Sequence, residues 1–477
     1  MKENIIGRER EQQILEERLS SGRAEFIAVY GRRRVGKTFL IKEYFEKEMV
    51  FQTAGMAKAG KAMQLKSFYS DLMYYGLPAG TPRPQDWIEA FSLLRRLIES
   101  HPNPRKVVLL DELPWMDTPK SGFIQALEHF WNSWASSKRD LVLVVCGSAT
   151  SWMMNKLINS HGGLYNRITC RLMIEAFTLR ETEKLLLSKG FHLSRYEIAE
   201  YYMIMGGTPF YLDMLSPAMS LAQNIDTLLF SPTGSLHDEF RNLYAALFKN
   251  SDDHEKVVEA LSRKGVGLTR EELLKASGLP SGGAFTTILQ NLKWCGFIRE
   301  YTNYHHSRGE QTLYQLVDFF TLFHYNFLVD KQSKADNTWT SIQVKPRFAT
   351  WMGLTFELLA LSHVNQIKQK LGIRGINTQE YAWRCPPTPS GEKGAQVDLV
   401  IVRDDRTVNL CEMKCSMTPY HITESEEMSL RNKVARFMEA DQRKHSVQLT
   451  FVSTFGVERG SHSGIVNNEI TLQDLFE

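Results

Sequence analysis

A strand-like segment that leads directly into a glycine-rich turn is the feature that most constrains how this chain folds. The apolar run Phe26–Tyr30 continues into Gly31-Arg32-Arg33-Arg34-Val35-Gly36-Lys37-Thr38, the pattern GxxxxGKT, and apolar residues at helical spacing follow it. The glycines of such a loop let backbone N–H groups face phosphate oxygens, the lysine reaches the outer phosphates, and the threonine hydroxyl ligates Mg²⁺. The pattern therefore predicts a phosphate-binding loop between a strand and a helix.

Two acidic residues complete the predicted phosphate site. Asp111 and Glu112 directly follow the apolar segment Val107–Leu110, which is typical of a buried strand. Ligands of open α/β sheets bind at the carboxyl ends of the strands, so these acids should emerge beside the phosphate loop. We expect Asp111 to hold Mg²⁺, mostly through water, and Glu112 to orient and polarise the attacking water. The alternative is an ordinary exposed turn after a strand.

Further polar residues follow a third predicted strand, Leu141–Cys146. Ser148 is our candidate for a hydrogen bond to the terminal phosphate or to the lytic water, although Ser148 or Thr150 can equally cap the next helix. Arg167 and Arg171 are candidates for the arginine that stabilises charge in the transition state. The sequence does not choose between them, and surface solvation or an ion pair is the alternative for either one.

Length and composition indicate an ordinary globular protein with several domains. The chain has 477 residues, more than one hydrophobic core usually supports, with 43% hydrophobic and 23% charged residues. Its net charge of +3 neither demands nor excludes nucleic acid as a partner. The charged N-terminus lacks the apolar core of a signal peptide, no run reaches membrane-spanning length, and the six scattered cysteines suit reduced thiols. We therefore expect a cytoplasmic protein with no membrane partner.

The pattern along the chain predicts four domains. Residues 1–176 alternate strands and helices, as in a mostly parallel sheet covered by helices. Residues 177–250 are predicted to form a small helical lid, interrupted by Gly206-Gly207-Thr208-Pro209. Residues 251–330 are predicted to form three helices and a hairpin, and a polar linker at 331–337 precedes a second α/β domain at 345–477.

The third region carries a helix-turn-helix pattern. Thr269-Arg270-Glu271-Glu272 is a capping box that starts a helix, Ser277-Gly278 ends it, and a second helix runs from about Gly283 to Cys295. Strand-like segments on both sides of a tip at 305–309 extend this pattern to a winged helix. The exposed side of the second helix is poor in positive charge, so DNA binding and docking of a protein or of another part of the chain are equal alternatives.

A second group of carboxylates lies in the C-terminal region. Glu412 and Lys414 share one face of a predicted strand because side chains alternate along a strand, and a hairpin brings Asp398 beside them. With Glu357 from the preceding helix, these carboxylates can hold one or two Mg²⁺ ions while Lys414 supports the nucleophile in attack on a phosphodiester. The alternative is a surface hairpin with an ion pair between Glu412 and Lys414.

The first half of the chain resembles the archaeal-type ATPases, which belong to the AAA+/STAND group of P-loop ATPases. This resemblance implies that the ligand is ATP, that the Gly-Arg-Glu segment sits near the adenine, and that Pro209 contacts the nucleotide base. It rests on Ile6-Gly7-Arg8-Glu9-Arg10-Glu11, the phosphate loop, Asp111-Glu112, Gly163-Leu164-Tyr165-Asn166-Arg167 and the Gly206–Pro209 break.

The C-terminal region resembles the PD-(D/E)XK nuclease superfamily. The resemblance is carried by Asp398, by Glu412-Met413-Lys414 and by the upstream helix that includes Glu357. More narrowly, the region looks like the uncharacterised domain often fused to archaeal-type ATPases. It implies a restriction-endonuclease-like α/β fold with a Mg²⁺-dependent nuclease site.

Together these patterns predict an α/β protein with a P-loop ATPase core, a helical lid, a winged helix and a nuclease-like domain. We expect an ATP hydrolase whose nucleotide state controls a Mg²⁺-dependent nuclease acting on DNA. The rival is a regulatory ATP switch whose last two domains only bind DNA or a protein partner. A third possibility is a nucleotide-driven homo-oligomer, because an arginine supplied in trans requires neighbouring copies.

Overall fold

The computed structural model describes residues 2, 4–159, 162–164, 166–248, 250–302, 304, 312–329, 339–387, 393–441 and 443–477. The predicted linker at 331–337 and the predicted tip at 305–309 lie outside these residues. The chain divides into two units: residues 1–176, 208–210 and 246–249 form unit 1, and the remaining residues form unit 2. In the part of the chain that the structure describes, no helix combines the length and the apolar character needed to cross a membrane.

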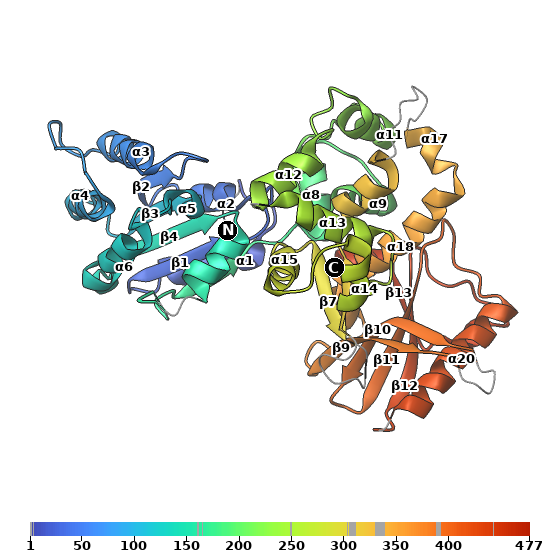
Figure 1. Cartoon of the computed structure of the whole chain (residues 1–477). Helices are drawn as coiled ribbons and strands as arrows, with labels where there is room; N and C mark the ends of the chain where they lie inside the picture. Colours follow the sequence, from blue (N-terminus) through green and yellow to red (C-terminus); the bar gives the residue numbers. More distant parts are fainter. Residues whose placement is uncertain are drawn as a thin grey trace. The chain divides into compact units, whose positions relative to one another are not determined.

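A five-stranded sheet with the order β2-β3-β4-β1-β5 organises unit 1 (Figure 1). All four neighbouring pairs are parallel, which confirms the predicted parallel α/β sheet. The central strands coincide with the three predicted segments, whereas the two edge strands, β2 and β5, were not predicted. The strands are β1 (Glu25–Tyr30), β2 (Met49–Ala54), β3 (Lys106–Asp111), β4 (Leu141–Gly147) and β5 (Cys170–Met173).

Both faces of this sheet are covered by helices, so its central strands are buried on both sides. Phe26 and Ala28 of β1 face a hydrophobic cluster formed with α3, α4 and α6, and Ile27 and Val29 face another formed with α1 and α2. Every residue of β4 is buried, as expected for a parallel sheet between two helical layers. The helices are α1 (Glu9–Leu19), α2 (Lys37–Tyr44), α3 (Lys61–Tyr74), α4 (Trp87–Ser100), α5 (Leu113–Met116), α6 (Phe123–Ser133), α7 (Thr150–Trp152), η1 (Ala135–Ser137) and η2 (Met153–Ile158).

Unit 2 begins with the helices predicted as a lid. Gly206 and Gly207 separate α9 from α10, and both adopt positive φ angles, 69° and 62°. A Cβ at Gly207 would overlap the carbonyl oxygen of Phe177, so this bend requires glycine. The helices are α8 (Leu179–Ser188), α9 (Arg195–Met205), α10 (Pro209–Asp213), α11 (Leu221–Ile225), η3 (Asp226–Phe230) and α12 (Glu239–Leu247).

The next segment combines helices α13, α14 and α15 with a small antiparallel sheet of the order β6-β8-β7, and it continues into α16 and η4. The predicted capping box is confirmed, because the Glu272 amide donates to Thr269 Oγ1 at 3.2 Å and the Thr269 amide donates to Glu272 Oε2 at 2.8 Å. Gly278 ends the helix in a left-handed conformation with φ 67°. The elements are α13 (Ser251–Ser262), β6 (Leu268–Thr269), α14 (Arg270–Ser277), α15 (Gly283–Trp294), β7 (Ile298–Thr302), β8 (Thr312–Leu316), α16 (Phe319–Phe323) and η4 (His324–Leu328).

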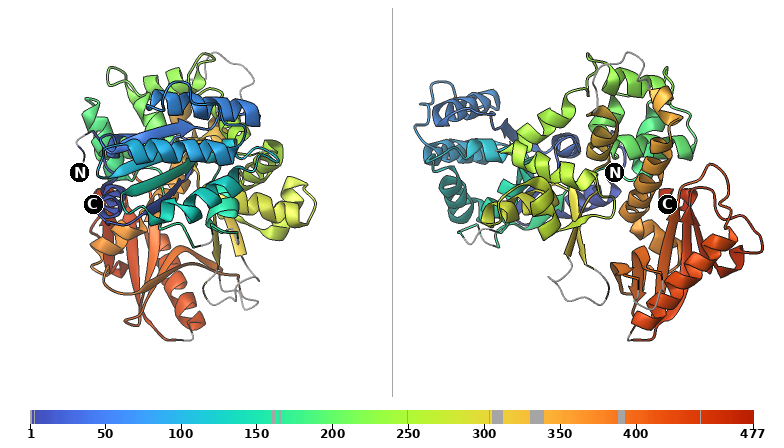
Figure 2. Two further views of the ribbon diagram at one scale, coloured as in Figure 1. Left: turned by 90° about the vertical axis from the view of Figure 1, so that its left-hand side faces the viewer. Right: turned by 45° about the vertical axis from the view of Figure 1, so that its right-hand side comes forward.

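A second five-stranded sheet, with the order β13-β12-β11-β10-β9, ends the chain. Strands β9, β10 and β11 are antiparallel neighbours, whereas β11, β12 and β13 run parallel. Helix α20 lies against this sheet (Figure 2), and its residues Leu430 and Phe437 belong to the hydrophobic cluster on the sheet. The elements are α17 (Trp339–Gln343), α18 (Pro346–Ser362), α19 (Val364–Lys370), β9 (Thr378–Cys385), β10 (Ala395–Arg403), β11 (Thr407–Lys414), α20 (Glu424–Ala440), β12 (Ser446–Ser453), η5 (Ser463–Ile465), β13 (Asn468–Thr471) and η6 (Leu472–Phe476).

Candidate functional site

The predicted phosphate loop joins β1 to α2 through an unusual backbone. Gly31 has φ 140°, and a Cβ there would overlap the carbonyl oxygen of Ile174, which follows β5. Gly36 has φ 85° and is the residue before the first turn of α2. Both glycines therefore occupy positions that other residues fill only with strain, which explains why the pattern has glycine at both ends.

Lys37 lies inside this loop. Its side chain is buried, and Nζ donates to the carbonyl oxygens of Gly31 at 3.0 Å and Arg32 at 2.8 Å. The helix dipole and the backbone N–H groups at the N-terminus of α2 already favour an anion. The Lys37 ammonium group, which is bound by carbonyl oxygens of the loop, adds positive charge at the same place.

Four side chains from three elements meet beside the loop. Thr38 Oγ1 donates to Asp111 Oδ2 at 2.7 Å, which joins α2 to the carboxyl end of β3. The Glu112 amide donates to Asp111 Oδ1 at 2.8 Å. Ser148, after β4, donates from Oγ to Glu112 Oε1 at 2.8 Å and lies 2.9 Å from Oε2. The structure thus brings Thr38, Asp111, Glu112 and Ser148 into one hydrogen-bonded chain.

Ser148 contacts the Glu112 carboxylate and does not cap the following helix. The residue preceding α7 is Ala149, and no side chain caps this helix. The alternative in which Ser148 or Thr150 serves as a helix cap is therefore wrong. Glu112 itself has φ 45°, a left-handed conformation that is uncommon for a residue with a long side chain. Strained conformations of this kind occur often at functional sites.

Two buried side chains, those of Cys146 and Arg8, lie close to parts of this candidate site. Burial, together with the Asp111 carboxylate, raises the pKa of the Cys146 thiol well above its usual value, so the thiol stays neutral. Arg8 is buried as well, and its Nη2 donates to the carbonyl oxygens of Val35 at 3.0 Å and Glu175 at 2.7 Å. The motif around Arg8 was predicted to lie near the adenine. The hydrogen bond from Arg8 to Val35 of the phosphate loop was not predicted.

The segment that contains Pro209 belongs to unit 1, although the residues on both sides belong to unit 2. The Phe210 amide lies 3.4 Å from the Arg34 carbonyl oxygen, and the Arg34 guanidinium carbon lies 3.9 Å from the centre of the Phe210 ring. Residues 208–210, which lie inside the lid predicted at 177–250, thus group with unit 1. Of the three arginines in the loop, Arg33 is exposed, whereas Arg32 and Arg34 are partly buried.

The two candidate arginines differ in their surroundings. Both side chains are exposed, but Arg171 lies close enough to Tyr30, the residue before the loop, to influence its titration. Burial raises the pKa of Tyr30, and the charge of Arg171 opposes this effect. Of the two candidates, Arg171 thus lies within electrostatic range of the residue that precedes the loop.

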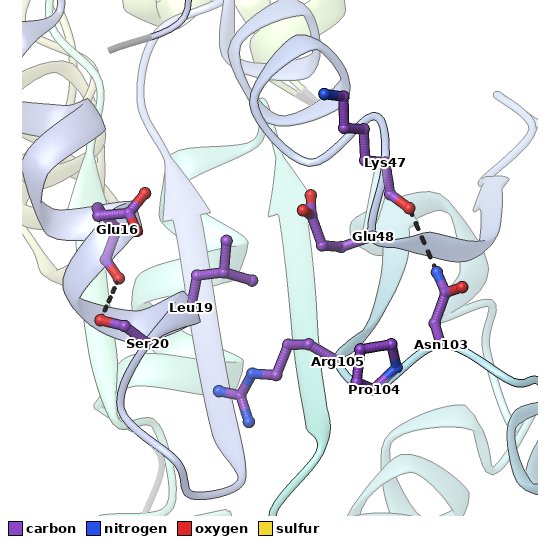
Figure 3. Close-up of a pocket in the computed structure, with 8 residues that line it drawn as sticks. All are labelled: Glu16, Leu19, Ser20, Lys47, Glu48, Asn103, Pro104 and Arg105. Carbon is purple, nitrogen blue, oxygen red and sulfur yellow. Dashed lines mark hydrogen bonds between the residues drawn. The ribbon is translucent and has the colours of Figure 1, made fainter.

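Unit 1 contains one cavity near the carboxyl ends of its strands and another near their amino ends. One, of about 290 Å³, adjoins Asp111 and is lined by Lys42, Thr53, Ser67 and Asp71 among others. The other, of about 360 Å³, lies near the amino end of β3, where Glu48 and Arg105 line it (Figure 3). Ligands of open α/β sheets bind at the carboxyl ends of the strands, so the first cavity is the one that extends the candidate site.

The predicted C-terminal residues also lie near one another. Leu399 pairs with Cys411, so the antiparallel register carried one pair further sets Asp398 opposite Glu412 on one face. Gln396 Nε2 donates to Asp398 Oδ1 at 2.8 Å. Burial and the charge of Asp398 raise the pKa of Glu357 to about 8, so Glu357 lies within electrostatic range of the strand pair.

Two ammonium groups neutralise Glu412. Lys414 Nζ lies 3.0 Å from Glu412 Oε1, and Lys433 Nζ, from α20, lies 2.6 Å from Oε2. Burial tends to raise the pKa of Glu412, but the two lysines outweigh it and lower the pKa. Lys433 was missed from the sequence, because it lies on another element with no motif around it. Among the residues described, no three His, Cys, Asp or Glu side chains are arranged to hold a metal ion.

The parallel sheet and the glycine-rich loop of unit 1 resemble those of P-loop ATPase cores. A solved structure with this fold is the Walker-type ATPase PABY2304 of Pyrococcus abyssi, which has 19% sequence identity and a TM-score of 0.52. The similarity covers 68% of this chain and 96% of that one, and at this identity it shows the fold alone.

Residues 5–215 match the model of an ATPase domain predominantly from Archaea. The uncharacterized ATP-binding protein MJ0423 of Methanocaldococcus jannaschii is 42% identical over 46 residues, which are 10% of this chain and 78% of that protein. The chain therefore belongs to this family of ATPase-domain proteins. The uncharacterized protein MJECL04 of the same organism is 22% identical over 419 residues, 86% of this chain and 87% of that protein, so the similarity extends through both units.

Proposed function

We propose that unit 1 binds ATP with Mg²⁺ and hydrolyses it. The observation that carries this proposal is the hydrogen-bonded chain from Thr38 through Asp111 and Glu112 to Ser148 beside the glycine loop. The family match at residues 5–215 supports the same activity. A hydroxyl and a carboxylate joined at 2.7 Å are oxygen ligands of the kind that Mg²⁺ prefers, so Thr38 and Asp111 fit this ion.

The position of each residue in the site indicates its role in ATP hydrolysis. The loop's N–H groups and Lys37 bind the phosphates, and bound Mg²⁺ offsets the charge that develops on them. Glu112 accepts a hydrogen bond from the attacking water and so orients it toward the terminal phosphate. Ser148 donates a hydrogen bond to the Glu112 carboxylate and so positions it, a different task from the expected hydrogen bond to the terminal phosphate or to the lytic water. Pro209, beside Phe210, is the proposed contact to the base.

Two variants of the full chain test this function. Lys37→Ala should abolish ATP binding, and Glu112→Gln should keep binding while lowering hydrolysis by roughly a hundredfold or more, since the amide no longer polarises water. Binding is measured by calorimetry with Mg²⁺-ATP, and hydrolysis by release of phosphate. Exposed Phe39→Ala is the matched control on α2. Hydrolysis that survives both site variants would overturn the proposal.

Two alternatives were predicted for the output of this ATPase. A Mg²⁺-dependent nuclease would use Asp398 and Glu412, but Glu412 is ion-paired with both Lys414 and Lys433. The ion pairs favour the alternative in which the predicted winged helix and the C-terminal sheet bind DNA or a protein partner. Plasmid cleavage with Mg²⁺ that depends on Asp398 would reverse this preference, and the comparison of wild type with Asp398→Ala decides it.

A further inference from the structure

Arg34 occupies a backbone conformation that its side chain disfavours. Its φ angle is 76°, in the left-handed region that glycine, asparagine and aspartate adopt more readily than arginine. It lies inside the phosphate loop, two residues before Gly36, so its dihedral angles help to aim the N–H groups that follow. Such a conformation persists only where surrounding contacts hold it.

Phe210 provides two such contacts. Its amide lies 3.4 Å from the Arg34 carbonyl oxygen, and its ring lies 3.9 Å from the guanidinium carbon. The second distance is well within the range at which a guanidinium group is attracted to an aromatic face. Phe210 is 37% exposed and follows Pro209 at the start of α10, directly after the Gly206-Gly207 bend.

We propose that Phe210 is a positioning residue for the phosphate loop. Through its contacts with Arg34, Phe210 keeps the loop in the conformation that receives phosphate. ATP binding then requires less rearrangement of the loop. The coupling is reciprocal, and a bound nucleotide that favours this conformation strengthens the contact with Phe210. The bend before α10 is thereby linked to occupancy of the loop. This inference rests on the proposed ATP binding.

The test measures the affinity of the full chain for Mg²⁺-ATP and the steady-state constants in variants at both positions. Phe210→Ala should weaken binding about three- to tenfold, as KM rises while kcat stays close to wild type. Phe210→Trp keeps an aromatic face and should restore affinity to within about twofold. In an Arg34→Gly background, glycine adopts the left-handed conformation readily and the guanidinium is absent, so Phe210→Ala should cause no further loss.

The results distinguish a failure of the proposed ATP binding from a failure of the proposed role of Phe210. If wild type does not bind ATP, or Lys37→Ala binds as well as wild type, the proposed function fails and the inference fails with it. If wild type binds ATP and Phe210→Ala binds equally well, only the inference fails. It fails too if the Arg34→Gly and Phe210→Ala losses simply add, or if Phe210→Trp is as weak as Phe210→Ala. Exposed Phe39→Ala, a control outside this contact, should match wild type.

Discussion

A buried histidine makes unit 2 sensitive to acid. His363, at the end of α18, is 1% exposed, and its Nε2 accepts a hydrogen bond from the Leu179 amide at 3.0 Å. Its Nδ1 lies 2.8 Å from the Leu359 carbonyl oxygen, which accepts a hydrogen bond from that nitrogen in the neutral ring. Protonation would place a second N–H against the Leu179 donor, so the neutral ring is the one that fits the fold.

The size of the effect follows from the pKa. Burial lowers the pKa of His363 from 6.5 to about 4 in the folded chain, outweighing the opposing effects of the Leu359 carbonyl and Glu181. Because the folded value lies below the unfolded one, this contribution to stability is full above pH 6.5 and is lost as the pH falls toward 4. A shift of this size corresponds to about 3 kcal/mol, of which about 2 kcal/mol should be lost between pH 7 and pH 5.

Urea denaturation at pH 7 and pH 5 measures this loss. The free energy of unfolding of wild type should fall by about 2 kcal/mol more than that of His363→Gln, because glutamine keeps an acceptor for Leu179 but does not titrate. His192→Gln, at an exposed position, is the matched control and should keep the wild-type response. Equal pH responses for wild type and His363→Gln would refute the reasoning.

Three further predictions concern single contacts. Gly31→Ala should destabilise unit 1 by more than about 2 kcal/mol, because its Cβ would overlap the Ile174 carbonyl oxygen, and an unchanged melting temperature would contradict this. Ser148→Ala should lower kcat about tenfold or more while ATP affinity stays close to wild type, since Glu112 loses its support. The opposite pattern would mean that Ser148 contacts the nucleotide directly. Thr269→Ala should lower stability in urea by about 1 kcal/mol through loss of the helix cap, whereas equal midpoints would argue against the cap's contribution.

The central strands and the phosphate loop could be predicted because their physical causes are local. Strands β1, β3 and β4 are buried on both faces, so each is a nearly continuous apolar run. The capping box at Thr269 depends on neighbouring residues alone. The edge strand β5 has only four residues, with buried and exposed positions in alternation, and a segment that short has too little pattern to stand out.

Contacts between distant residues could not be predicted in this way. Glu112 meets Ser148 because β3 and β4 are neighbours in the sheet, and Lys433 reaches Glu412 from a helix that follows the strand by many residues. No spacing rule connects such pairs, since their proximity depends on the packing of whole elements. The residue types in these sites were predictable from motifs, whereas the partner of each side chain required the structure.

The segments of the two units alternate along the sequence, and this order matters for the design of shortened proteins. Residues 208–210 and 246–249 belong to unit 1, although they lie far beyond its main segment, which ends at residue 176. A protein truncated at Ala176 would therefore lack Phe210 and the segment that packs on Arg34. The family match, which continues to residue 215, includes that segment. A protein that contains only residues 1–176 would thus lack two segments that pack in unit 1. Fusions and deletions are therefore better designed with the whole chain kept.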